Sequence, residues 1–187
     1  MRIGVFGGTF DPPHLGHWLA AVDAAEALSL DRVAWIPAAQ QPLKAHVTSA
    51  EATHRLAMTR LAVEGDARFV ADALELERGG TSFMVDTLRA YRTRQPDAAL
   101  FLLLGADAAV LLPKWREPET IRSLAQIVVL TRGGEDMVLP DGARSLSTRR
   151  VDVSATEIRA RVAAGRSVRG FVTDAVAAYI AAHGLYR

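Results

Sequence analysis

The feature that most constrains the fold is a regular alternation of short apolar runs with longer helix-forming stretches along all 187 residues. Strand patterns are expected at 3–6, 33–36, 69–71, 100–104 and 127–130, and helical patterns at 17–28, 50–63, 83–94 and 118–124. Strands that alternate with helices form βαβ units, in which a parallel sheet is covered by helices. We therefore predict an α/β fold with a doubly wound parallel sheet and helices on both faces.

Length and composition fit a single domain of this kind. A chain of 187 residues buries roughly 70% of the surface that its unfolded form exposes, so it needs no disulfide or metal to hold the fold. We expect one Rossmann-like domain over residues 1–187 that ends in a short helical part at about 154–187. Residues 38–49 and 133–148 show no clear periodicity and are expected to be loops.

The composition also excludes several classes of function. The chain has no cysteine, which excludes disulfides, thiolate catalysis and cysteine-ligated zinc. Its net charge of +1 argues against a dedicated nucleic-acid binder. No apolar run reaches the roughly 18 residues that span a membrane, and the N-terminal run is too short for a secretory signal. We therefore expect a cytoplasmic protein without membrane or nucleic-acid partners.

The most informative segment is the turn at residues 7–17, between the first strand and the first helix. A doubly wound sheet places its phosphate site there. Gly7 and Gly8 let the backbone approach a ligand. His14 and His17 are three residues apart and share a face at the helix start, where the helix dipole favours an anion. The two imidazoles can donate hydrogen bonds to phosphate oxygens, and Gly16 leaves room for the ligand.

Other interpretations of this turn fit less well. No Gly-Lys-Ser/Thr follows, so it is not a Walker A loop, and the glycines lack the Gly-x-Gly-x-x-Gly spacing of a dehydrogenase. A zinc site would need a third ligand, and the remaining histidines form no ligand pair with His14 and His17, so we expect no protein-held metal. A proline-rich turn with incidental histidines would explain one histidine. Two histidines beside a double glycine favour an anion site.

A second candidate site begins at Ser154. Ser154 at the N-cap and Glu157 three residues later form the pattern of a capping box, which an ordinary helix start would also show. Arg159, however, places a positive charge early in the helix, where it opposes the helix dipole unless an anion is bound. Ser154 and Thr156 can then donate to phosphates, and the Arg159 guanidinium can form a forked contact. We assign both capping and binding to this segment.

Five segments, at 7–17, 105–107, 112–115, 153–159 and 184–187, resemble the HxGH-type nucleotidyltransferases, and among these the bacterial nicotinate-nucleotide adenylyltransferases. The resemblance covers nearly the whole chain. It implies that the phosphate of nicotinate mononucleotide attacks the α-phosphate of ATP in line, giving nicotinate adenine dinucleotide, an NAD precursor, and pyrophosphate. It further implies that Mg²⁺ accompanies ATP as cofactor, that both partners are small molecules, and that the chain could form a homo-oligomer.

The resemblance, together with the positions above, assigns three groups of site residues. The catalytic group is His14, His17, Lys44 and Arg159. The ATP-binding group is Gly7, Gly8, Thr9, Phe10, Gly16, Gly105, Asp107, Arg132, Ser154 and Thr156. The group for nicotinate mononucleotide is Ser82, Met84, Trp115 and Arg116.

Some of these residues have ordinary structural alternatives. Asp107 follows a buried strand through Gly105 and could simply cap a helix; the resemblance implies a role near ribose or adenine. Trp115 could cover the edge of the core, whereas in the family it stacks on the pyridine ring. Arg132 is placed to reach the nucleotide but could equally be a solvated loop residue.

Three positions depart from the family pattern. Leu43 stands where the family has a histidine before Lys44, Met84 where a threonine is frequent, and Arg116 where an aromatic residue is usual. Arg116 could supply a charge for the nicotinate carboxylate. The alternatives are a nicotinamide-mononucleotide or phosphopantetheine adenylyltransferase, a glycerol- or choline-phosphate cytidylyltransferase, or a non-catalytic nucleotide-binding module.

Overall fold

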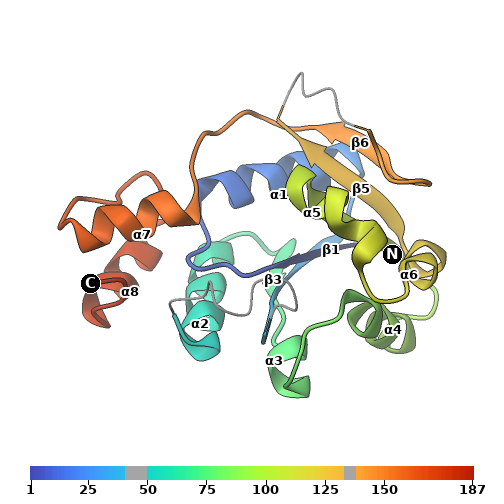
Figure 1. Cartoon of the computed structure of the whole chain (residues 1–187), viewed down its shortest axis with the longest axis horizontal. Helices are drawn as coiled ribbons and strands as arrows, with labels where there is room; N and C mark the ends of the chain where they lie inside the picture. The colour runs from blue at the N-terminus through green and yellow to red at the C-terminus, as the bar shows by residue number, and fades with distance from the viewer. Residues whose placement is uncertain (41–49, 133–137) are drawn as a thin grey trace.

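The computed structural model describes residues 1–40, 50–132 and 138–187. Within them, six parallel strands form one sheet in the order β3-β2-β1-β4-β5-β6 (Figure 1). The strands are β1 (Arg2–Gly8), β2 (Arg32–Pro37), β3 (Phe69–Ala71), β4 (Ala99–Gly105), β5 (Gln126–Thr131) and β6 (Arg144–Ser147). This order is that of a doubly wound sheet, and it reverses between β1 and β4. The predicted fold class is therefore confirmed.

Helices lie between most of these strands, and two more follow the last strand. They are α1 (Leu15–Ala27), α2 (Ala52–Val63), α3 (Leu74–Arg78), α4 (Met84–Arg94), α5 (Ala106–Leu111), a 3₁₀ turn η1 (Leu112–Lys114), α6 (Pro118–Leu124), α7 (Ala155–Ala163) and α8 (Asp174–Ala182). The predicted helices begin and end within two residues of these bounds, the usual scatter of helix ends. No helix among the described residues is long and apolar enough to cross a membrane.

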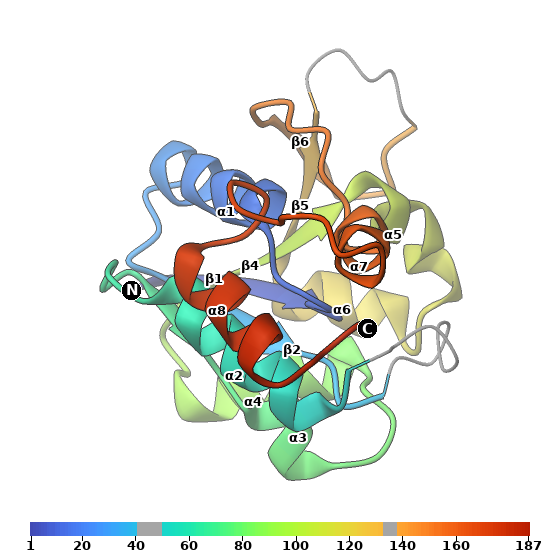
Figure 2. The same ribbon diagram turned by 90° about the vertical axis from the view of Figure 1, so that its left-hand side faces the viewer.

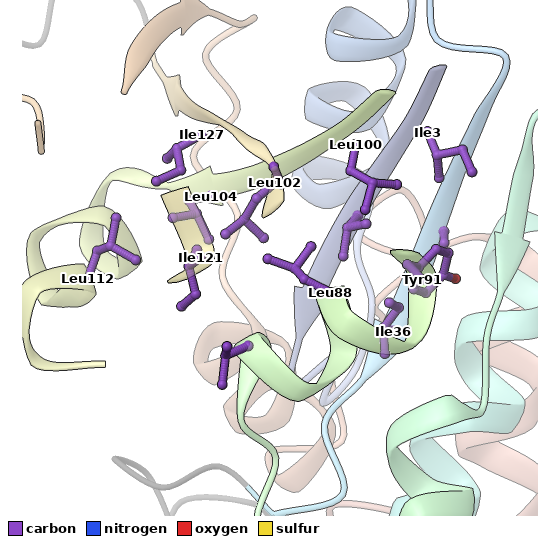
Figure 3. Packing of buried hydrophobic residues seen from close by; sticks show 14 of the residues in the cluster. Ile3, Ile36, Leu88, Tyr91, Leu100, Leu102, Leu104, Leu112, Ile121 and Ile127 are labelled. Atoms are coloured by element: carbon purple, nitrogen blue, oxygen red, sulfur yellow. The ribbon is translucent and has the colours of Figure 1, made fainter. Parts of the chain in front are cut away.

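The apolar run of β4 is explained by helices on both faces of the sheet. Leu100, Leu102 and Leu104 belong to one buried cluster with Leu88 and Tyr91 of α4 (Figure 3). The intervening residues of β4 join a second cluster, with the alanines of α1. Since successive side chains of a strand point to opposite faces, a central parallel strand is apolar along its whole length.

A third buried cluster lies beside the sheet and contains the C-terminal part of the chain. It joins Met58 of α2 to Ile158 of α7 and to Val176 and Ile180 of α8. Figure 1 shows α7 and α8 at one end of the molecule, and Figure 2 shows α8 in front of α2. The helical C-terminal part that the sequence predicts is therefore present, and it packs on α2.

Four short elements were not expected. Strand β6 lies in the stretch 133–148, and its sequence Arg-Ser-Leu-Ser shows no apolar face because this edge strand is mostly solvated. Helices α3 and α5 and the turn η1 have five, six and three residues, too few to show helical periodicity. The prediction that 133–148 forms only a loop is wrong for Arg144–Ser147.

Candidate active site

The carboxyl ends of three central strands position the candidate site. β1 ends at Gly8 and β4 at Gly105, and Gly105 lies opposite Leu130 near the end of β5. His14, Asp107 and Arg132 follow these strands. A Cβ built at Gly105 would meet no atom within 4 Å, so the chain leaves space at this edge. In doubly wound sheets, ligands bind beyond the strand ends where the strand order reverses, which here is between β1 and β4.

His14 and His17 form a reciprocal cap at the start of α1. His14 Nδ1 accepts the backbone N–H of His17 at 3.4 Å, and the backbone N–H of His14 donates to His17 Nδ1 at 3.3 Å. The two rings are stacked with centroids 3.7 Å apart. Because each Nδ1 is an acceptor, a neutral ring carries its proton on Nε2. The pair therefore offers two Nε2–H donors, as the shared helix face predicted.

Both imidazoles are neutral at pH 7. Burial lowers the pKa of His14 to about 4, and the nearby charge of Arg132 acts in the same direction. Burial also lowers the pKa of His17 well below its usual value, and the neighbouring His14 and Arg132 contribute further. The histidines thus supply donors without charge, and among the described residues Arg132 places a positive charge near both of them.

Arg159 connects the start of α7 to the turn after β1. Its Nη1 donates to the backbone carbonyl of Asp11 at 2.8 Å, and its Nη2 donates to Thr156 Oγ1 at 3.3 Å. Ser154 caps α7 by accepting the backbone N–H of Glu157 at 3.1 Å, which confirms the predicted N-cap. The structure thus brings Thr156 and Arg159 to the turn that carries the histidines, although Thr156 lies 142 positions after His14 in the sequence (156 − 14).

Gly16 marks the place where the two helix starts approach each other. A Cβ at Gly16 would lie 3.1 Å from the His14 ring and 3.7 Å from the carbonyl oxygen of Val153. The residue before the α7 cap thus lies beside the first turn of α1. Two helix N-termini, which each favour an anion, meet at this point.

The glycines and the aromatic residue of the β1 turn also serve local packing. A Cβ at Gly7 would lie 2.7 Å from Met84 Cε, and one at Gly8 would lie 2.9 Å from the Phe10 ring. Phe10 is buried and stacks on Trp35 with centroids 5.2 Å apart. Its side chain therefore belongs to the core, and only its backbone remains available for a ligand.

Of the residues assigned to nicotinate mononucleotide, two lie next to the end of β1 or β2. Met84 lies against Gly7. Ser82 Oγ accepts the backbone N–H of Ala39 at 2.9 Å, and Ser82 N–H donates to the carbonyl of Gln40 at 2.8 Å. Ser82 is therefore tied to the chain that follows β2.

The other two follow η1. Trp115 is half-buried against the core cluster on the α4 face. The Arg116 guanidinium lies over the Phe83 ring at 5.0 Å and pairs with Asp86 at 3.5 Å and Glu117 at 3.6 Å. Its charge is thus shared with two carboxylates, which weakens the hypothesis that it serves a nicotinate carboxylate alone.

The alternative that Asp107 caps a helix is wrong, because Gly105 is the N-cap of α5 and Asp107 is an exposed residue of its first turn. Lys44 and Leu43 lie in the segment 41–49, outside the described residues.

Sequence reasoning missed three residues beside this site: Asp11, Arg55 and Tyr186. Asp11 is 3% exposed and accepts the Tyr186 hydroxyl at 2.7 Å through Oδ1. Arg55 is 2% exposed and donates to the Thr9 carbonyl at 2.9 Å. One signal for Arg55 exists in the sequence, because it shares helical spacing with the buried Met58.

Fold and site together define a nucleotide-binding α/β protein, with an anion site built from two helix N-termini, two imidazole donors and arginines. Residues 5–161 match the model of the cytidylyltransferase-like family. Relatives named as probable nicotinate-nucleotide adenylyltransferases are 56% identical in Gemmatimonas aurantiaca, over 100% of this chain and 93% of the relative, and 49% identical in Thermus thermophilus, over 100% of both. The chain therefore belongs to the cytidylyltransferase-like family, and within it to the nicotinate-nucleotide adenylyltransferases.

The fold agrees with a solved structure of the same description. The nicotinic acid mononucleotide adenylyltransferase of Plasmodium falciparum, complexed with NaAD, superposes with a TM-score of 0.77 at 17% identity. The superposition covers 99% of this chain and 97% of that one. At this identity the likeness concerns the fold.

Proposed function

We propose that this chain transfers the adenylyl group of ATP to nicotinate mononucleotide, giving nicotinate adenine dinucleotide and pyrophosphate in NAD biosynthesis. The observation that carries the proposal is the His14–His17 pair at the reversal of the strand order, in a chain whose full-length relatives bear this enzyme's name. Two neutral donors next to arginines suit a phosphate chain that gains charge at its leaving group.

The reaction needs positioning and charge stabilisation more than covalent chemistry. A phosphate oxygen of the mononucleotide forms a bond to the α-phosphorus of ATP, while the bond from that phosphorus to the pyrophosphate oxygen breaks. In our proposal His14 and His17 donate their Nε2–H groups to the reacting phosphates. Arg159 and Arg132 offset the negative charge of the ATP phosphates, with Lys44 as a further cation.

The remaining ATP contacts come from the loops around the strand ends. Ser154 and Thr156 lie at the N-terminus of α7. Gly7 and Gly8 end β1, Thr9 and Phe10 follow it, and Gly16 lies in the first turn of α1. Gly105 leaves space for the nucleotide, and Asp107 would reach its ribose or adenine. Ser82, Met84, Trp115 and Arg116 would surround the pyridine ring of the mononucleotide.

Magnesium would arrive with ATP. Among the described residues, no group of three or more His, Cys, Asp or Glu side chains is placed to hold a metal ion. Mg²⁺ is commonly bound through substrate phosphates and water, so a protein cage is not required. We therefore assign no residue to it and derive no step through it.

Pyrophosphate release tests the proposal. The full chain is incubated with MgATP and nicotinate mononucleotide, nicotinamide mononucleotide or phosphopantetheine, with CTP and glycerol phosphate as a further arm. We expect the highest turnover with nicotinate mononucleotide. His17→Ala should lower the rate about a hundredfold, or about 3 kcal/mol, by analogy with loss of one oxyanion donor. Equal or faster turnover of the amide would overturn the nicotinate assignment, and wild-type turnover by His17→Ala would overturn the mechanism.

A further inference from the structure

Arg55 of α2 is buried and uses all three of its guanidinium nitrogens. Nε donates to the carbonyl of Ala50 at 3.2 Å, Nη1 to those of Thr9 and Ala38 at 2.9 and 2.7 Å, and Nη2 to that of Ala39 at 3.2 Å. The acceptors come from the turn after β1, the end of β2 and the approach to α2. A guanidinium suits this position, because its planar fork holds several acceptors at fixed angles.

The hydrogen bond from Arg55 to the Thr9 carbonyl holds the turn that we propose binds the ATP phosphates. Thr9 lies two residues before Asp11, whose carbonyl holds Arg159 at 2.8 Å. Asp11 is itself close enough to Arg55 to favour its charged form, against the burial that lowers the Arg55 pKa. Any shift of the Thr9 peptide would therefore move the turn that carries His14 and the Asp11 carbonyl to which Arg159 donates.

The hydrogen bonds from Arg55 to the Ala38 and Ala39 carbonyls hold the chain beside the proposed mononucleotide pocket. Arg55 holds the carbonyls of Ala38 and Ala39, while Ser82 Oγ holds the Ala39 N–H at 2.9 Å. Both backbone polar groups of Ala39 are thus hydrogen-bonded, its N–H to Ser82 and its carbonyl to Arg55. Met84, two residues further along, packs against Gly7. Arg55 is the side chain that connects this pocket to the ATP turn.

We infer that Arg55 is a positioning residue, which fixes the ATP half of the site relative to the mononucleotide half. The inference rests on the proposed function. Arg55 is too deeply buried to contact substrate, so it acts through the peptides it holds. In-line transfer requires the attacking oxygen and the α-phosphorus to meet at a defined distance and angle, and a displacement of about 1 Å can cost about a hundredfold in rate.

Arg55→Lys tests the inference. The ammonium keeps the charge but has one nitrogen with three N–H groups, so it cannot hold four carbonyls. We expect kcat for dinucleotide formation to fall by at least about tenfold, with KM for each substrate changed by less than about threefold, because each half of the site stays intact while their alignment is lost. Arg60→Lys is the matched control, since Arg60 is exposed on the same helix. It should keep wild-type kcat.

Arg55→Ala with added guanidinium ion supplies a second readout that a purely structural role would not move. Guanidinium should restore part of the lost kcat in Arg55→Ala and none in Arg60→Ala. Wild-type kcat in Arg55→Lys would overturn the inference. So would unfolding of both Arg55 variants by circular dichroism, because the residue would then serve folding alone. Failure of the proposed function appears separately, as a wild-type chain that releases no pyrophosphate.

Discussion

At the residue scale, the site depends on imidazoles that donate without carrying charge. The pKa of His14 lies at about 4 in the folded chain, against about 6.5 in an unfolded one. Between these values the unfolded chain binds a proton at this position and the folded chain does not. The contribution of neutral His14 to the free energy of unfolding is therefore fully present above pH 6.5. It is lost as the pH falls toward 4.

This difference predicts a pH-dependent free energy of unfolding. Between pH 7 and pH 4 the wild-type chain should lose about 3 kcal/mol more than His14→Asn, in which the asparagine keeps an N-cap acceptor but does not titrate. Denaturant unfolding at several pH values measures the loss, and NMR titration of the His14 ring should give a midpoint of about 4. A midpoint near 6.5 would show that burial does not lower the pKa of His14.

At the residue scale, sequence motifs indicate which residues belong to the candidate site but not the protonation states of those residues. Motifs at the helix starts indicate His14, Arg159 and Thr156 as site residues, and in the structure Arg159 contacts both Thr156 and the turn that carries His14. The neutral state of the histidines depends on burial, which motifs do not show. Arg55 was missed because an arginine on a helix is usually solvated, and only its spacing from Met58 indicated otherwise.

At the scale of elements, the two glycines at the strand ends have different surroundings: Gly105 faces open space, whereas Gly8 packs against a core side chain. Gly105 has φ −67° and no atom within 4 Å of an added Cβ, so the fold itself does not require glycine there. Gly105→Asn, which retains a good N-cap, should leave the unfolding temperature unchanged and weaken ATP binding by at least about tenfold, or about 1.4 kcal/mol, because it fills the nucleotide space. Calorimetric titration with ATP measures this.

Gly8→Ala is the contrasting variant. Its Cβ would lie 2.9 Å from the buried Phe10 ring, which is packed between Phe6 and Trp35. Overpacking of this kind costs about 1–3 kcal/mol, so this variant should be destabilised before any ligand is added. Unchanged ATP affinity in Gly105→Asn would show that the nucleotide lies elsewhere.

The elements themselves were predictable in proportion to their burial. Strand β4 and the helices of ten or more residues have faces that must be apolar, and their patterns appear in the sequence. Strand β6 is mostly solvated, and helices α3 and α5 are too short to show a period although each buries an apolar residue, Leu74 and Ala109. These elements form because neighbouring strands and turns hold the chain in position, and local sequence patterns do not show such tertiary contacts.

At the scale of the whole molecule, the C-terminal part is joined to the sheet through the segment between β1 and α1. The backbone N–H of Leu15 donates to the carbonyl of Phe171 at 2.8 Å, Arg159 donates to the Asp11 carbonyl, and the Tyr186 hydroxyl donates to Asp11 Oδ1 at 2.7 Å. Asp11 is separated in the sequence by 148 positions from Arg159 and by 175 positions from Tyr186. Periodicity does not report such distances, so the junction could not be predicted although its motifs could.

These contacts predict that Tyr186 stabilises the fold through its hydrogen bond to Asp11. Burial and the Asp11 carboxylate raise the pKa of Tyr186, so its hydroxyl remains a donor across the physiological pH range. Tyr186→Phe removes this donor from a buried carboxylate and should lower the free energy of unfolding by about 2 kcal/mol, the usual scale for a hydrogen bond to a charged group. Tyr179→Phe is the control, because its hydroxyl meets His54 at 2.9 Å at a half-buried position on α8 and should cost about 1 kcal/mol or less. Denaturant unfolding of both variants measures the difference, and equal losses would show that the contact with Asp11 does not carry the junction.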